Sequence, residues 1–333
     1  MTVQMGSTRR RRRTTGVAAG AAVAMITLAS CGGLSEDTGP AAGAGSLAES
    51  VDLSDASYIV GGKDFDEQLV LCEIAVAALQ STGAEVTNSC DVGGTNVTRQ
   101  ALVGGEIDLY WDYTGTAWVS FFGEEPIQDP AEQYQVVAKR DLQENDIHWL
   151  TPSGFNNTYA FAVLESKAAE LNLRTQSDMA AFYRNGGTGP TCVESEYLNR
   201  ADGLPGYQQT YEFQLPTDPT VLETNAVYAA TANPADCLFG EVFTTDGRIK
   251  GLDLRVLEDD RSYHPFYNAA IAIRDDAYRQ NPDVEKVFEP IATALTQEVM
   301  QTLNTRKSSE GVDQRTVARE WLQEMGFIGA AQG

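Results

Sequence analysis

Aromatic side chains gather at four places where short strands are expected to begin or end. Residues 110–116 (YWDYTGT) end one expected strand, and residues 155–159 (FNNTY) begin another. Residues 243–248 (FTTDGR) end a third strand, and residues 265–268 (PFYN) precede a fourth. Ligands of open α/β sheets bind beyond the carboxyl ends of strands, so these rings could converge in one cleft. Converging ring faces attract a cation, and a quaternary ammonium suits them because it has no N–H group to hydrogen-bond.

Residues suited to catalysis are sparse. The chain has no G-x-S-x-G, P-loop or H-E-x-x-H motif, and its two histidines have no evident nucleophile partner. Two pairs of acids, Glu194 with Glu196 and Asp259 with Asp260, could act as acid–base groups in a glycosidase. In so acidic a chain we interpret both pairs as solvated charges. We therefore assign no catalytic residue, and a secreted hydrolase is the enzymatic alternative.

The charge of the chain limits its partners. Its 333 residues include 24 Lys and Arg against 47 Asp and Glu, a formal net charge of −23. Phosphate binding needs a basic face, so nucleic acid is excluded as a partner. No cofactor is expected either.

The N-terminus is typical of an export signal. A basic run at residues 9–13 precedes a small and apolar run at residues 16–29, which is too short to predict a membrane span. The run ends in residues 28–32 (LASCG), which look like a bacterial lipobox with Cys31 as the lipidated cysteine. We expect a signal peptide over residues 1–30, a flexible tether over residues 31–56, and lipid anchoring to the outer face of the cell membrane. A plain secretory signal with an accidental cysteine is the alternative.

Four cysteines remain after the expected cleavage. An even number in an exported protein favours two disulfides. Four cysteines allow three pairings, and the order of the chain suggests one bridge in each half. Free buried thiols are an alternative, whereas no metal site is expected because there is no C-x-x-C motif. The suggested pairs are Cys72 with Cys90 and Cys192 with Cys237.

Short strands and helices alternate from residue 58 onward. Apolar residues at helical spacing predict a helix over residues 67–80, between strands at residues 58–62 and 85–87. This alternation implies parallel α/β sheets, and the length fits two lobes with a central cleft. The other expected strands are 107–111, 159–164, 238–243, 254–258 and 268–273, and the other expected helices are 97–103, 177–183, 221–231, 283–303 and 314–325.

Six ordered segments resemble the osmoprotectant-binding proteins of ABC transporters. Residues 61–68 (GGKDFDEQ) are similar to the G-S-K-x-F-x-E-Q opening of that family. The resemblance covers about residues 57–327, and six ordered motifs are far more specific than any single one. The other five segments are 93–96 (GGTN), 105–110 (GEIDLY), 112–116 (DYTGT), 155–159 (FNNTY) and 244–248 (TTDGR).

The resemblance implies a type II periplasmic-binding-protein fold of the α/β class, with a ligand cleft between two lobes. We expect lobe 1 to comprise residues 57–157 plus 268–327, and lobe 2 residues 158–267. The family binds glycine betaine, choline, carnitine or proline betaine and delivers it to a membrane permease. A polyamine or amino-acid receptor is the alternative, and it would need carboxylates along the pocket because those ligands carry N–H groups.

Carried over position by position, the resemblance implies an aromatic cage of Tyr113, Tyr159, Phe243 and Tyr267. The family often has Tyr at the third position, so Phe243 keeps the ring face and loses a hydroxyl. Any one of these rings, taken alone, would be better explained as part of the core.

The resemblance also implies a set of polar pocket residues. Lys63 and Arg200 resemble positions that hold a ligand carboxylate in betaine-binding members. Thr116 is expected to donate a hydroxyl hydrogen bond. The remaining polar residues implied by the family pattern are Gln68, Asn96 and Asn157.

Overall fold

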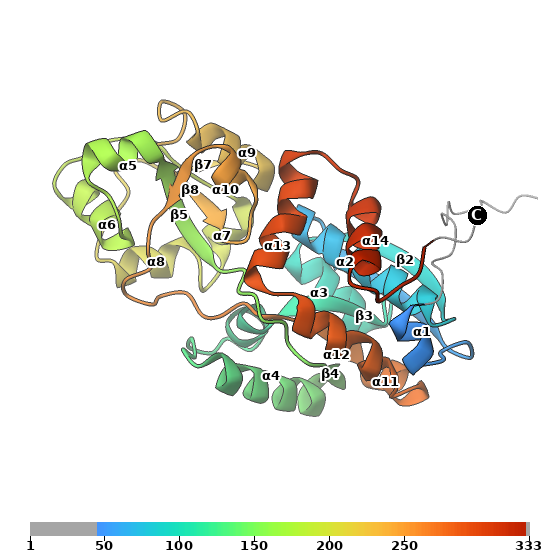
Figure 1. The fold of residues 1–333 in the computed structure, drawn as a ribbon. Coiled ribbons are helices and arrows are strands. Elements are labelled where there is room, and N and C mark those ends of the chain that lie inside the picture. The colour runs from blue at the N-terminus through green and yellow to red at the C-terminus, as the bar shows by residue number, and fades with distance from the viewer. Residues whose placement is uncertain (1–44, 331–333) are drawn as a thin grey trace, which may run out of the picture. The chain divides into compact units, whose positions relative to one another are not determined.

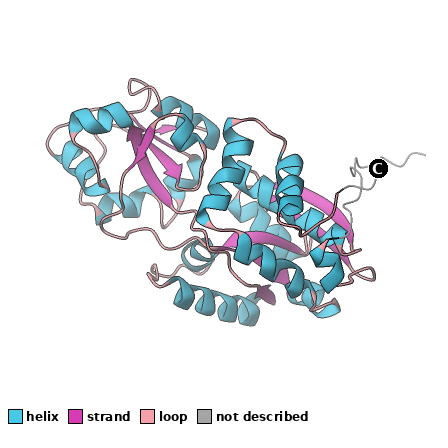
Figure 2. Ribbon diagram, viewed as in Figure 1, coloured by secondary structure: helices cyan, strands magenta, loops and turns pink. Residues whose placement is uncertain are grey.

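The computed structural model describes residues 45–330, whose strands form two five-stranded sheets (Figures 1 and 2). The predicted signal peptide, Cys31 and the first part of the predicted tether lie outside the described residues. The first sheet has the strand order β2-β1-β3-β10-β4. Its strands are β1 (Ser57–Lys63), β2 (Glu85–Gly93), β3 (Leu109–Tyr113), β4 (Ile147–Trp149) and β10 (Ala269–Arg274).

The second sheet is built from the intervening part of the chain and has the order β7-β6-β8-β5-β9. Residues 150–158 lead from the first sheet into it, and residues 257–268 lead back. Its strands are β5 (Tyr159–Leu164), β6 (Thr191–Val193), β7 (Thr220–Val221), β8 (Phe239–Phe243) and β9 (Leu254–Val256).

Both sheets are mixed, which corrects the expectation of parallel sheets. β1 is parallel to β2 and β3, whereas β10 is antiparallel to β3 and β4. In the second sheet β6 is parallel to β7 and β8, whereas β5 is antiparallel to β8 and β9. β5 and β10 are the strands that follow the two crossings between sheets. β5 starts beside the end of β8, and β10 starts beside the end of β3. The alternation of strands and helices in the sequence does not reveal this reversal of strand direction.

Helices fill the connections within each sheet. The first sheet and the C-terminal region carry α1 (Ser46–Ser50), α2 (Asp66–Ser81), α3 (Thr95–Gly104), η1 (Thr116–Phe121), α4 (Pro130–Asn145), α11 (Asp275–Gln280), α12 (Val284–Ala294), α13 (Gln297–Asn304), η2 (Thr305–Ser309) and α14 (Gln314–Glu324). The second sheet carries α5 (Glu165–Leu171), α6 (Gln176–Arg184), α7 (Ser195–Asn199), α8 (Leu204–Thr210), α9 (Thr224–Thr231) and α10 (Arg248–Gly251).

Two expected helices differ from the structure, for two local reasons. The helix expected over residues 283–303 is divided into α12 and α13, because the Thr296 side chain accepts a hydrogen bond from the backbone N–H of Val299 and starts a new helix. The helix expected over residues 221–231 begins only at Thr224, since residues 220–221 form β7.

The predicted tether is too long at its C-terminal end. Residues 46–50 form α1, and the backbone N–H groups of Ser46 and Leu47 donate to the carbonyls of Gly326 and Phe327. Leu47 is buried in the core, together with Val51 and Leu53. These apolar side chains and backbone bonds hold the segment against the C-terminal region, so residues 46–50 are folded rather than part of a flexible tether.

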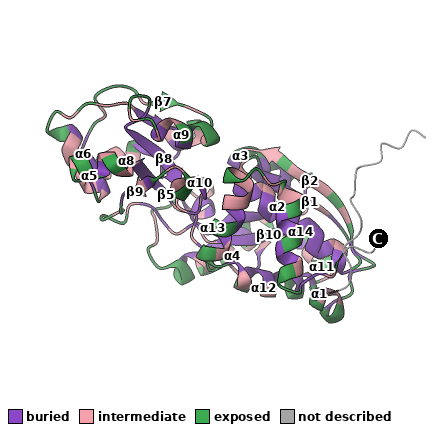
Figure 3. Ribbon diagram, turned by 45° about the horizontal axis from the view of Figure 1, so that its top comes forward, coloured by how far each residue is buried: buried purple, intermediate pink, exposed green. Residues whose placement is uncertain are grey.

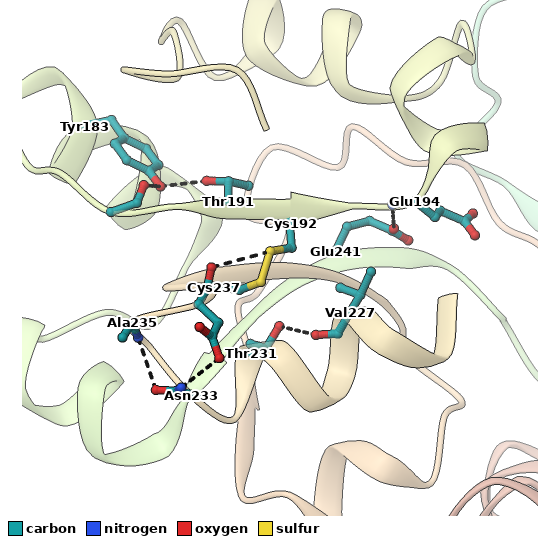
Figure 4. The surroundings of a disulfide bond; sticks show 12 residues. Tyr183, Thr191, Cys192, Glu194, Val227, Thr231, Asn233, Ala235, Cys237 and Glu241 are labelled. Atoms are coloured by element: carbon teal, nitrogen blue, oxygen red, sulfur yellow. Dashed lines mark hydrogen bonds between the residues drawn. A yellow bond between two sulfur atoms is a disulfide. The ribbon is translucent and has the colours of Figure 1, made fainter. Parts of the chain in front are cut away.

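Buried residues concentrate on α2 and on the inner strands β1, β3, β5, β8 and β10, whereas the edge strands β2 and β7 have none (Figure 3). α2 packs against β1, β2 and α14, and these contacts bury most of its residues. The disulfide between Cys72 and Cys90 joins α2 to β2. The disulfide between Cys192 and Cys237 joins β6 to the segment just before β8 (Figure 4). Each sheet therefore carries one disulfide.

Candidate functional site

Strand pairing brings the predicted cage rings together. Tyr159 begins β5 and Phe243 ends β8, and these two residues are cross-strand partners in the second sheet. Tyr113 ends β3 opposite Ala269 of β10, two residues after Tyr267. Residues at paired strand ends have neighbouring side chains when they share a face. The four rings thus come from strand ends of both sheets.

The rings contact one another closely. The ring centroids of Tyr159 and Phe243 lie 5.0 Å apart, and those of Tyr159 and Tyr267 lie 5.4 Å apart in an edge-to-face arrangement. Gly115 permits this packing, because a Cβ atom there would lie 2.9 Å from the Tyr267 ring. Burial raises the pKa of Tyr159 and Tyr267 well above the ordinary value. Both therefore stay neutral phenols near neutral pH.

A fifth ring, which the sequence analysis missed, links the two ends of the cage. Phe65 stacks on Phe243 with centroids 5.5 Å apart and on Tyr113 with centroids 6.4 Å apart. Phe65 precedes α2 inside the segment 61–68, so its aromatic character was visible in the sequence. The rings border a cavity of about 50 Å³. It is lined by Lys63, Asp64, Phe65, Tyr113, Thr116, Asn157, Tyr159, Glu194, Glu196, Thr224, Phe243 and Tyr267.

Lys63 lines the cavity but already has a carboxylate partner. Its Nζ lies 2.9 Å from Asp112 Oδ1, and both side chains are almost fully buried. The same Nζ lies 5.1 Å from the centroid of the Tyr113 ring. Asp112 also accepts hydrogen bonds from the Tyr110 hydroxyl and the Tyr113 backbone N–H. Lys63 is therefore held by β3, the strand that carries Tyr113.

Arg200 lies behind the cavity rather than in its lining. Its guanidinium donates from Nε and Nη2 to the two oxygens of Asp202, each at 2.7 Å, and from Nη1 to Glu196 at 2.8 Å. Asp202 also accepts from the Tyr267 hydroxyl at 2.6 Å. The Arg200 guanidinium lies 5.4 Å from the centroid of the Tyr159 ring. Arg200 thus contacts the Tyr159 ring directly and positions the Tyr267 ring through Asp202.

Acids that the sequence analysis interpreted as solvated line the cavity instead. Glu194 accepts from the Thr224 hydroxyl at 2.7 Å, and its backbone N–H donates to Glu241 at 3.2 Å (Figure 4). Burial and the nearby Glu196 raise the pKa of Glu194 to about 7. Burial would also raise the pKa of Glu196, but Arg200 and Lys63 lower it below the ordinary value.

Glu241 lies on β8 behind Glu194 and is almost fully buried. Burial and the Glu194 carboxylate raise its pKa well above the ordinary value. Its Oε1 has no hydrogen-bond partner among the described residues. Burial and the neighbouring carboxylate thus favour the protonated form of Glu241. Asp64, Glu194 and Glu196 are the acids that line the cavity.

A second buried acid, Glu67 on α2, fixes the other end of the cage. It accepts from the Tyr113 hydroxyl at 2.8 Å, the Thr245 hydroxyl at 2.6 Å and the Asn304 amide at 2.7 Å. Burial raises the pKa of Glu67 despite these three donors. One carboxylate thus joins β3, the loop after β8 and α13.

The remaining predicted polar residues divide between the cavity and its surroundings. Thr116 and Asn157 line the cavity, and the Asn157 amide lies 3.5 Å from the Tyr113 hydroxyl. Gln68 is buried beside it, where its Oε1 accepts from the backbone N–H of Lys63. Asn96 is exposed on α3 and is not part of the lining.

Residues 56–324 match the family described as the substrate binding domain of ABC-type glycine betaine transport systems. The chain belongs to this family. The glycine-betaine-binding protein of Pseudomonas aeruginosa is 35% identical over 272 residues, which cover 80% of this chain and 86% of that protein. The glycine betaine-binding protein YehZ of Escherichia coli is 31% identical over 296 residues, which cover 85% of this chain and 97% of YehZ.

Solved structures show the same fold. Apo YehZ superposes with a TM-score of 0.63 at 30% identity, covering 81% of this chain and 99% of YehZ. A crystal structure named for a glycine betaine/carnitine/choline ABC transporter gives a TM-score of 0.67 at 25% identity, with 81% and 99% covered. This substrate-binding protein therefore has the two-sheet α/β architecture of type II periplasmic-binding proteins.

Membership of the family places the chain among extracytoplasmic substrate-binding proteins that work with an ABC permease. Between residues 45 and 330, no helix is long and apolar enough to cross a membrane. Within the same range, no group of three or more His, Cys, Asp or Glu side chains could hold a metal ion.

Proposed function

We propose that this substrate-binding protein takes up a small quaternary amine in the ring-lined cavity and delivers it to an ABC permease without changing it chemically. The observation that carries the proposal is the convergence of Phe65, Tyr113, Tyr159, Phe243 and Tyr267 on one cavity. Ring faces and methyl groups together bind a quaternary ammonium by cation–π attraction and by burial of apolar surface. The relatives named for glycine betaine support the same ligand class.

The cage already attracts cations within the protein itself. Lys63 lies over Tyr113, and Arg200 lies over Tyr159. Both contacts support the proposal that these ring faces attract positive charge. In this proposal Thr116 and Asn157 contact the ligand, whereas Gln68 and Arg200 position the rings.

Isothermal titration calorimetry tests the proposal directly. The mature protein is titrated with choline, glycine betaine, carnitine and proline betaine, and with glycine as a small control that lacks the quaternary ammonium. Binding of at least one quaternary amine, and its loss of affinity in Tyr159→Ala, is the expected result. Failure of all four to bind would overturn the proposal.

A polyamine or amino-acid receptor is the second candidate, and one observation favours it. Asp64, Glu194 and Glu196 line the cavity, as a ligand with several N–H groups would require. Titration with spermidine and with lysine separates the candidates. Binding of either one in preference to every quaternary amine would favour this second function.

The proposed function also includes a lipid anchor at Cys31 and the closure of two lobes around the ligand. We propose that Cys31 is lipidated after cleavage of residues 1–30, and that residues 57–157 plus 268–327 and residues 158–267 close as two lobes around the ligand. Cys31→Ala should then release the protein from the membrane fraction or leave its signal uncut. Unchanged processing and membrane association would contradict the lipid anchor.

A further inference from the structure

The charged lining of the cavity is acidic. One cationic side chain, Lys63, lines it together with three acids, Asp64, Glu194 and Glu196. The nearby Arg200 adds a second positive charge, but its guanidinium is bonded to carboxylates on three of its nitrogens. A ligand in this cavity therefore meets an excess of negative charge.

Neither Lys63 nor Arg200 could bind a ligand carboxylate without sharing it with a carboxylate of the protein. A ligand carboxylate that approached Lys63 would also approach Asp112, 2.9 Å from Nζ and fully buried. A ligand carboxylate that approached Arg200 would meet Asp202 and Glu196 in the same way. Like charges at such distances in a buried site repel strongly, because little water screens them.

The acids instead offer acceptors to a ligand. Carboxylates such as Glu194 and Glu196 only accept hydrogen bonds when they are ionised, so they suit a ligand hydroxyl and not a ligand carboxylate. Glu196 is bonded to Arg200, which also keeps its pKa low. An ionised acceptor therefore lies in the cavity near neutral pH.

We propose that this cavity selects a quaternary amine with a net positive charge and a hydroxyl tail, the chemistry of choline, over amines that carry their own carboxylate. The inference rests on the proposed function and narrows its ligand class. The rings hold the quaternary nitrogen. Glu196 on α7 and Glu194, the residue before α7, accept a hydrogen bond from the ligand hydroxyl and balance its positive charge. Lys63 and Arg200 hold protein carboxylates, in place of the ligand-binding role that the family pattern implies for them.

Calorimetric titration at pH 8 with choline, tetramethylammonium, carnitine and glycine betaine tests the inference. Choline should bind at least about tenfold more tightly than glycine betaine, since one hydrogen bond to a charged group is worth about that factor. Tetramethylammonium, which has the charge without the hydroxyl, should lie between them. Carnitine has both a hydroxyl and a carboxylate, and it should bind more weakly than choline.

Two isosteric variants identify the groups responsible. Glu194→Gln and Glu196→Gln should each reduce the preference for choline over glycine betaine, mainly by weakening choline binding. Glu132→Gln, a change on the exposed surface of α4, is the matched control and should leave the preference unchanged. Thermal melts show that each variant is folded before titration.

The outcomes separate this inference from the proposed function. Glycine betaine binding as tightly as choline, or an unchanged preference in both cavity variants, would overturn the selection of net charge while leaving the quaternary-amine function intact. Failure of all four amines to bind the folded protein would overturn the function itself.

Discussion

Two sets of carboxylates contact the lining of the ring-lined cavity, Glu67 at Tyr113 and Glu241 at Glu194, and they differ in how many donors they meet. Glu67 accepts three side-chain hydrogen bonds, one of them from Tyr113. Glu241 accepts one backbone N–H, from Glu194, and its other oxygen has no partner among the described residues. A buried acid with several donors is stabilised in one geometry, whereas acids with few donors respond to any charge brought near them.

The difference indicates separate roles for the two groups. Glu67 and Asn304 belong to proposed lobe 1, and Thr245 belongs to proposed lobe 2, so the Glu67 bonds join the lobes at one end of the cage. Glu194 faces the cavity, with Glu241 behind it, and can change its protonation when a cation enters. Glu67 with its donors, the fixing group, holds the geometry of the site. Glu194 with Glu241, the adapting group, changes its protonation with the ligand.

The largest expected effect is a loss of stability when Glu67, the acid of the fixing group, is changed. Glu67→Gln replaces one acceptor oxygen by an amide donor that faces other donors, so at least one buried hydrogen bond to the side chain is lost. We expect the free energy of unfolding to fall by about 2–4 kcal/mol, measured by urea denaturation. Glu132→Gln on the surface should change it by less than about 0.5 kcal/mol. Equal stability of Glu67→Gln and the wild type would show that the Glu67 bonds do not hold the site.

A smaller effect is expected when a ring is removed without touching Glu67. Tyr159→Ala should weaken binding of the quaternary amine by about 1–2 kcal/mol or more, because a desolvated cation–π contact is lost. Tyr159→Phe should cost much less, since the ring face remains. Tyr113→Phe should differ from Tyr159→Phe by also lowering stability, because it removes the hydroxyl that donates to Glu67. Equal stability of the two Phe variants would contradict a stabilising role of the bond from Tyr113 to Glu67.

The smallest effect concerns protons at the adapting group. The charged groups that face Glu194 are Glu196, Arg200, Asp64 and Glu241. Its pKa is about 7 in the ligand-free protein, and a bound cation should lower that pKa, so binding should release part of a proton. If the pKa of Glu194 falls by one on binding, cation binding should strengthen about fivefold as the pH rises from 6 to 8.

Titrations at pH 7 in two buffers of different ionisation enthalpy measure this proton release, and Glu194→Gln should abolish it. The same raised pKa has a consequence for folding. The folded protein holds this proton more tightly than the unfolded chain, so the contribution of Glu194 to stability falls as the pH rises from the ordinary glutamate value toward 7. Proton uptake on binding, or none in the wild type, would be incompatible with an adapting Glu194.

The sequence predicted the rings better than the charges. Tyr159 and Phe243 stand at strand ends, where local pattern and the family resemblance agree. Lys63 was expected to be free for a ligand, because its partner Asp112 is 49 positions away and meets it only when β1 and β3 pair in one sheet. Asp202, only two positions from Arg200, was a nearer signal that the sequence analysis did not use.

Burial of the cavity acids could not be predicted from local sequence. Glu194 follows β6, and Glu241 lies on β8, and the two strands are neighbours only through the parallel pairing and the bridge between Cys192 and Cys237. In an acidic chain, two nearby glutamates are usually solvated. The antiparallel strands β5 and β10 were missed for a similar reason, since strand direction depends on where the chain crosses between sheets.

A crystal structure of the mature protein with choline would show directly which groups bind the charge and the hydroxyl. We expect the quaternary nitrogen within about 6 Å of the ring centroids of Tyr113, Tyr159, Phe243 and Tyr267, with the hydroxyl donating to Glu194 or Glu196. A ligand bound elsewhere, or a hydroxyl bonded to Lys63 with the acids turned away, would contradict this expectation.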